Sequence, residues 1–247
     1  MLLSELFDQL TYGELSQLEY SGADNQGLLI EDHKRIIPHI NLALTELYKR
    51  FPLRKEEVII HCQDHIQTYY LTYKYAATNK QSDVKYKYIH DSIFQPFNDN
   101  VLKIERVFNE DGQELHLNET DPYIIQTETL QQSRKAWSVN TPTYNSIQIP
   151  YPMETNSLLV EYRADHEKIP KDNLYPDEIE IDIPSALLEA LLQYIASRAY
   201  TSLGGDSAQE GNNFMTKFEA SVIKVEQLGL VNSDNTTNQK LEVNGWR

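Results

Sequence analysis

The sequence is poor in cysteine and in long apolar runs, and each shortage excludes a class of protein. A single cysteine, Cys62, among 247 residues rules out an internal disulfide and fits synthesis in a reducing compartment. No stretch of about eighteen apolar residues is present, so we expect no membrane-spanning helix. The opening segment, MLLSELFDQL, carries acidic residues where a secretory signal peptide carries basic ones, so we expect no secretion.

Positive charge is also scarce. Lysine and arginine number 22 against 37 aspartates and glutamates, which gives a formal net charge of −15. Because proteins that grip nucleic acid neutralise its phosphates with lysine and arginine, this balance argues against tight DNA binding. It is compatible with a wall that DNA passes without adhering, and equally with a surface whose acidity only aids solubility.

Motifs that carry catalysis or hold a nucleotide are missing from the sequence. It contains no Walker loop, no Gly-x-Ser-x-Gly elbow and no Gly-x-Gly-x-x-Gly turn. The nearest approach to a metal motif is His61-Cys62-Gln63-Asp64-His65, whose two histidines, four residues apart, suit a metal only if they share a helix face. We interpret it as a surface turn, since no supporting His or Cys cluster occurs elsewhere.

Other titratable residues also have ordinary interpretations. Acidic residues are densest at Asp177, Glu178, Glu180 and Asp182, which we interpret as a solvated linker. His33 and His39 flank a helix start and are interpreted as surface or capping residues. We therefore predict no catalytic residue, no metal and no cofactor.

The clearest pattern is a pair of amphipathic helices in the last third of the chain. Pro184 suits a first helical position, and Gly204-Gly205 suits the end of a helix. Ser207 and Glu210 form a capping box for a second helix, which reaches Leu228. The apolar positions at helical spacing are Leu188, Leu191, Leu192, Ile195, Ala199 and Leu203 in the first helix, and Phe214, Phe218, Val222, Val225 and Leu228 in the second.

Two such helices cannot bury their apolar stripes alone, so they need a bundle, a sheet or a neighbouring subunit. The candidate subunit-packing residues are Leu188, Leu192, Arg198, Phe214 and Phe218. We expect Arg198, a charge within an apolar helix, to pair with Glu189 or Glu219 in preference to a neighbouring subunit.

The N-terminal part is predicted to be helical. Ser4 is expected to cap a short helix over 5–10, and Thr11 with Glu14 to cap a second one. The strongest helix spans 31–51, where Pro38 should kink the helix or mark the start of its regular part.

Between 55 and 170 the pattern changes to short strands with turn residues between them, which predicts a small antiparallel domain. Tyr69, Tyr70, Tyr73 and Tyr75 belong to a tyrosine-rich β region. The predicted strands are 66–75, 101–107, 113–117, 123–126, 146–149 and 157–163, with a hairpin turn at 110–112.

The predicted fold class is therefore α+β. A helical bundle is formed by an N-terminal part, 1–54, and a C-terminal hairpin, 171–231, with an inserted antiparallel β domain at 55–170. An extended C-terminal arm, 232–247, is too polar to fold by itself. It nevertheless carries Leu241, Val243 and Trp246, which suit an anchor in a partner's groove.

Three separated blocks carry a resemblance to a known family. They are RIIPHINLALTELYKRF at 35–51, VLKIERVFNEDGQELHL at 101–117, and IPSALLEALLQYIASRAYTSLGG at 183–205 followed by FMTKFEASVIKVEQLGL at 214–230. In order and spacing these blocks resemble the N-terminal helix, inserted β-hairpin and C-terminal helical hairpin of head-to-tail adaptors of podovirus-type tailed bacteriophages. These adaptors are also called connector or tail tubular proteins.

The resemblance implies a structural virion protein and not an enzyme. Family members form rings, typically of twelve subunits, which bind below the portal protein, extend the DNA channel used in DNA ejection and provide the platform for tail or nozzle proteins. The expected location is the neck of the virion, after assembly in the host bacterial cytoplasm, and the natural partner of Leu241, Val243 and Trp246 is the portal. Two alternatives remain open: a virion-associated hydrolase with an acidic pair, and a host-surface binding module that uses tyrosines.

Overall fold

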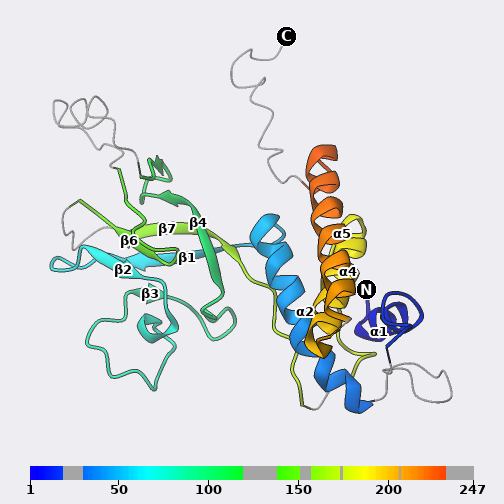
Figure 1. Ribbon diagram of the computed structural model, residues 1–247. Helices are drawn as coiled ribbons and strands as arrows, with labels where there is room; N and C mark the ends of the chain where they lie inside the picture. Colours follow the sequence, from blue (N-terminus) through cyan, green and yellow to red (C-terminus); the bar gives the residue numbers. More distant parts are fainter. Residues whose placement is uncertain (19–29, 119–137, 151–156, 173–174, 206, 232–247) are drawn as a thin grey trace, which may run out of the picture. The chain divides into compact units, whose positions relative to one another are not determined.

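The computed structural model describes residues 1–18, 30–118, 138–150, 157–172, 175–205 and 207–231 (Figure 1). These residues form an α+β protein with four α-helices, a five-stranded antiparallel sheet and a two-stranded sheet. They divide into a helical unit, Met1–Leu53 with His166–Arg247, and a β unit, Arg54–Asp165. The β unit ends at Asp165, before the boundary expected at 170, because Ile169 is buried in the helical core.

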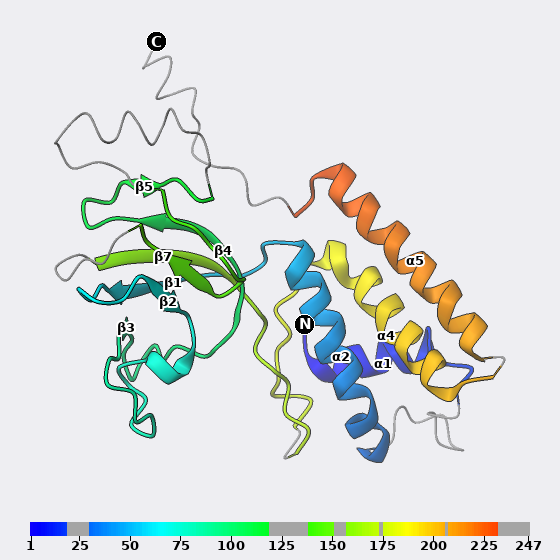
Figure 2. The same ribbon diagram turned by 60° about the vertical axis from the view of Figure 1, so that its left-hand side comes forward.

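The helical unit contains helices from both ends of the sequence (Figure 2). Helices α1 (Leu3–Tyr12) and α2 (Ile30–Arg50) come from the N-terminal part. The 3₁₀ turn η2 (Ser185–Leu187) leads into α4 (Leu188–Leu203), which is followed by α5 (Ser207–Leu228). The predicted C-terminal helical pair is therefore present, with its first turn in 3₁₀ form.

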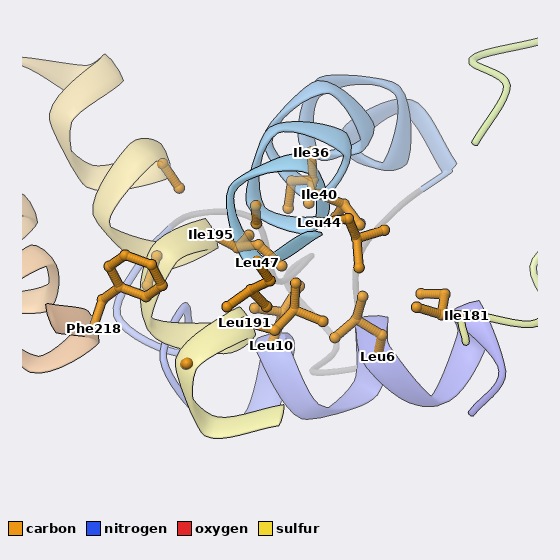
Figure 3. Close-up of a cluster of buried hydrophobic side chains, with 14 of the residues drawn as sticks. Leu6, Leu10, Ile36, Ile40, Leu44, Leu47, Ile181, Leu191, Ile195 and Phe218 are labelled. Atoms are coloured by element: carbon orange, nitrogen blue, oxygen red, sulfur yellow. The ribbon is translucent and has the colours of Figure 1, made fainter. Parts of the chain in front are cut away.

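One hydrophobic cluster joins these helices (Figure 3). It combines residues of α1 and α2 with residues of α4 and α5, so segments more than a hundred residues apart in the sequence are packed together. The labelled members are Leu6, Leu10, Ile36, Ile40, Leu44, Leu47, Ile181, Leu191, Ile195 and Phe218. Burial of these side chains is the main force that holds the unit together.

Helices α4 and α5 approach each other closely at a glycine. A Cβ atom added to Gly211 would lie 2.4 Å from Thr201 Oγ1 and 3.0 Å from the carbonyl oxygen of Ser197. Only glycine fits this crossing without a shift of the helices, so the small side chain at position 211 fixes the tight packing of the pair.

The N-terminal helix differs from its prediction. It begins at Leu3, where the backbone N–H of Leu2 donates to the Glu5 carboxylate at 3.0 Å, so Ser4 lies inside the helix and is not its cap. Thr11 also lies within α1, and its hydroxyl donates to the Phe7 carbonyl at 2.7 Å. The predicted second cap is therefore wrong. Helix α2 runs through Pro38, which does not mark its start.

The β unit is built on a sheet with strand order β3-β1-β7-β4-β5, in which all pairs are antiparallel. The strands are β1 (Lys55–His61), β3 (Ile89–His90), β4 (Val101–Phe108), β5 (Glu114–Leu115) and β7 (Ser157–Ala164). Strands β2 (Thr68–Tyr70) and β6 (Ser146–Gln148) form the second sheet. The predicted hairpin joins β4 to β5, and Gly112 supplies a turn φ of 76°.

Two strand predictions fail in this unit. Strand β1 was not predicted, and its presence places His61 in a strand instead of a surface turn. The predicted strand 66–75 shrinks to β2, because the N–H of Tyr70 donates to the Tyr88 hydroxyl and the chain then enters the 3₁₀ turn η1 (Tyr73–Tyr75). The predicted strand 123–126 lies outside the described residues.

Candidate interaction surface

The outer face of the five-stranded sheet carries an apolar stripe across three strands. In β1 the side chains of Val58 and Ile60 point to the core, so Ile59 between them points outward and is 38% exposed. The register places Ile59 opposite Leu159 of β7, and Leu159 opposite Phe108 of β4. These three side chains form the floor of a depression of about 520 Å³, which we call the apolar groove.

Charged side chains surround the apolar groove. Glu57 lies directly opposite Glu161, a pairing of like charges that is unfavourable alone. Lys55 and Arg106 offset it, because their charged nitrogens lie 3.4 Å and 3.7 Å from the Glu161 carboxylate. The rim is therefore a partly neutralised network in contact with water.

Arg106 also positions the edge of the groove. Its guanidinium donates two hydrogen bonds to Glu114, at 2.9 and 2.7 Å, and lies 4.8 Å from the centre of the Phe108 ring. These hydrogen bonds lower the pKa of Glu114 against the opposing effect of burial. The arginine thus holds the aromatic ring at the end of the stripe.

A short loop after β3 presents two apolar side chains to solvent. Residues 91–97, which we call the finger, form a turn in which the N–H groups of Ser92 and Gln95 each donate to the carbonyl of the other, at 3.3 and 3.1 Å. At its tip Ile93 is 82% exposed and Phe94 is 99% exposed. Adjacent large apolar residues with so much exposed surface are typical of a binding surface.

The base of the finger is held firmly. The Asp91 carboxylate accepts hydrogen bonds from the Thr78 N–H at 2.9 Å, from the Thr78 hydroxyl, and from the Phe97 N–H at 3.2 Å. Burial alone would raise the pKa of Asp91, but these hydrogen bonds outweigh it and the pKa lies below its ordinary value. Phe97 is buried against the Tyr162 ring, so the exposed tip stands on an ordered base.

No protein-family model matches this chain, and no curated protein matches it at a significant level. None of the helices in the described ranges is long and apolar enough to cross a membrane.

The candidate subunit-packing residues lie mostly inside the chain's own core. Phe218 is fully buried and Phe214 is buried, both in the cluster that α5 forms with the other helices, while Leu188 and Leu192 are half-buried against it. These side chains are thus already covered by their own chain. Phe214 and Phe218 therefore pack within their own chain, and a role of these positions in subunit packing stays a prediction.

Arg198 is exposed on α4, and its predicted partners are engaged elsewhere. Glu189 accepts a hydrogen bond from Gln193 at 3.1 Å, and Glu219 accepts two from Arg50 at 2.6 and 2.8 Å. The prediction of a local Arg198 pair is therefore wrong. Burial and the nearby charge of Arg198 together lower the pKa of His39.

The histidines and the cysteine of the metal-like motif serve local contacts. His61 Nδ1 lies 2.9 Å from Ser157 Oγ, and His65 Nδ1 lies 2.6 Å from Asp64 Oδ1. Burial raises the pKa of Cys62 to about 11, so its thiol stays protonated. Within the described ranges, no group of three His, Cys, Asp or Glu residues is arranged to hold a metal ion.

The acidic segment 177–182 has a structural role beyond that of a solvated linker. The Leu3 N–H donates to the Ile179 carbonyl at 2.9 Å, and the Ile181 N–H donates to the Met1 carbonyl at 2.8 Å. Ile181 enters the helical core, while the acidic side chains of Asp177, Glu178, Glu180 and Asp182 stay exposed.

Two predictions remain, one for His33 and one for the C-terminal anchor residues. His33, interpreted as a surface or capping residue, stacks on Phe7 at 3.9 Å between ring centres, which is a packing contact. The candidate anchor residues Leu241, Val243 and Trp246 lie outside the described residues.

Proposed function

We propose that this protein is a structural virion component, a head-to-tail adaptor that forms a ring on the portal and carries the tail. The observation that supports it best is the shared hydrophobic cluster of α1, α2, α4 and α5, with the β unit inserted between them in the sequence. The three resembling blocks fall on α2, on the β4–β5 hairpin and on the α4–α5 pair.

The proposed ring joins identical subunits head to tail, by contacts between two different patches of each subunit. The central part of the apolar faces of α4 and α5 is covered within the chain, while Leu203 and Leu228 at their ends are exposed, so such contacts draw on exposed surfaces. The apolar groove and the finger are two neighbouring exposed apolar features of the β unit, and they are formed by different side chains.

We propose that DNA passes through the ring without specific binding. A net charge of −15 favours a channel lined mainly by acidic and polar residues, which repels phosphate. Tight, salt-sensitive binding of DNA by the isolated protein would contradict this part of the proposal, as would a positively charged channel in an assembled ring.

The C-terminal arm, through Leu241, Val243 and Trp246, is proposed to bind the portal. Electron micrographs of the purified chain mixed with the portal protein encoded in the same genome should show a ring coaxial with the portal. A chain truncated after Val231 should lose most of its portal binding. If the truncated chain binds the portal with full affinity, the arm has no such role, and if the full chain forms no ring on the portal, the adaptor proposal is wrong.

The proposed role is mechanical and requires no catalysis. Assays of the purified chain against peptidoglycan and polysaccharide test this directly. Turnover that is abolished by a single carboxylate substitution would support the hydrolase alternative and overturn the structural one.

A further inference from the structure

We propose that the finger of one subunit docks in the apolar groove of the next, so that a one-way contact joins successive copies of this chain. The inference rests on the proposed ring and names the surfaces that would close it.

The finger borders one end of its own groove without filling it. Strand β3 is antiparallel to β1, with Ile89 opposite Ile60 and His90 opposite Ile59, so the finger leaves β3 toward the beginning of β1. The apolar groove reaches Phe108, Gly112 and Ser157 near the β4–β5 turn, and its other end at Glu57 and Ile59 lies beside the base of the finger. Phe94 is almost fully exposed, so the finger does not fill its own groove.

The two surfaces are chemically complementary. The sequence of the finger beyond Asp91, Ser-Ile-Phe-Gln-Pro-Phe, carries no charge, so its burial needs no charged partner. The floor of the groove is apolar, and the Glu161 carboxylate beside it is already paired with Lys55 and Arg106, so a docked apolar side chain meets no unpaired charge there. An aromatic anchor in an apolar pocket with a polar rim is the usual form of an interface hot spot.

The size and rigidity of the two parts fit the same contact. A depression of about 520 Å³ lies within the range of cavities that hold small ligands, and is large enough to receive a phenyl side chain. The hydrogen bonds to Asp91 fix the base of the finger, so little conformational freedom is lost on docking. Because finger and groove are different patches, the contact repeats in one direction, and it forms a ring when the rotation between successive copies closes.

The test measures the mass of assemblies formed by full-length variants over a range of concentrations, with and without portal. Phe94→Ala removes the anchor, and Ile59→Glu places a charge on the floor of the groove. Each should raise the concentration needed for half-assembly by about 100-fold, in line with the loss of a hot-spot residue. Tyr144→Ala, which removes an aromatic side chain that is 66% exposed elsewhere in the β unit, is the matched control and should assemble like the wild type.

Mixing the two variants gives the sharpest readout. The Phe94→Ala chain keeps a groove and the Ile59→Glu chain keeps a finger, so an equimolar mixture should form a 1:1 dimer that grows no further. Circular dichroism of each variant confirms that it is folded.

The outcomes separate this contact from the adaptor proposal. A wild-type ring that is unaffected by either substitution, a mixture that yields no dimer, or a wild-type chain that stops at a dimer would overturn the one-way contact. A wild-type chain that stays monomeric at every concentration, with portal present, would overturn both the contact and the ring.

Discussion

Replacement of Phe218 by alanine should destabilise the helical unit strongly, because this side chain is buried in its own chain. Phe218 has no exposed surface, its ring meets Tyr194 edge-on at 5.0 Å, and the Arg50 guanidinium lies 5.0 Å from its centre. Removal of a buried phenylalanine side chain costs about 3–5 kcal/mol. Loss of the aromatic pair adds up to about 1 kcal/mol. We expect a loss of about 4 kcal/mol, a large share of the roughly 5–15 kcal/mol that stabilises a typical domain.

The assay is urea unfolding followed by helical circular dichroism, with Phe94→Ala as the matched control. Both variants lose the same atoms, but Phe94 is 99% exposed, so its replacement should change the free energy of unfolding by less than about 0.5 kcal/mol. If Phe218→Ala unfolds like the wild type yet fails to assemble, Phe218 lies at a subunit interface and the assignment to the core is wrong.

Three further perturbations test single contacts. Glu219→Gln removes an ion pair with Arg50, and because the Glu219 side chain is 41% exposed, solvent screening limits the loss to about 1 kcal/mol. Hydrogen bonds from Arg50 lower the pKa of Glu219, so the stabilisation is present above the ordinary pKa of 4.5. It is lost as the pH falls through the pKa of the folded state. The urea unfolding curves of variant and wild type should therefore converge in acid. Asn41→Ala removes the side chain that hydrogen-bonds to the N–H and the carbonyl of Ile169, at 2.9 and 3.0 Å. The free energy of unfolding should fall by about 2 kcal/mol, and hydrogen exchange of the Ile169 amide should accelerate. Asp91→Ala frees the base of the finger, so hydrogen exchange at the Phe97 amide should be faster in the variant at pH 7. Because the pKa of Asp91 is lowered, exchange in the wild type should approach that of the variant only as the pH falls below about 3.8. Unchanged unfolding for the first two, or unchanged exchange for the third, would contradict the contact concerned.

The sequence predicted the helical elements well because their periodicity reports burial directly. The stripe through Phe214, Phe218 and Val222 is buried, as its spacing indicates. What the spacing could not decide is which surface covers the stripe, since a core and a subunit interface demand the same side chains. The same limit applies to Arg198, whose expected partner Glu219 is bound by Arg50 from a distant helix.

The β unit was harder to predict because its strands are short and partly charged. Only Val58 and Ile60 of β1 face the core, and the charged residues at 55–57 hide that alternation. The tyrosines around 69–75 favour a strand by propensity, but Tyr88 satisfies the backbone of Tyr70 with its hydroxyl. Long-range hydrogen bonds of this kind leave no local signal.

The candidate surface was also missed by sequence reasoning, although one signal could have found part of it. Ile93-Phe94 stands between Asp91-Ser92 and Gln95-Pro96, so two large apolar residues occupy the middle of a turn. Such residues are exposed by their position. The apolar groove gave no such signal, because its three side chains come from β1, β4 and β7 and meet only through the strand register.

The central claim, a ring that docks on the portal, is tested most directly by the mass of the complex in solution. Mass photometry of the portal protein with an excess of this 28.7 kDa chain should show the portal species gain one discrete increment, equal to a whole number of subunits of a closed ring. The chain should saturate at that increment as its concentration rises. A portal species whose mass stays unchanged while the chain remains monomeric would contradict the account.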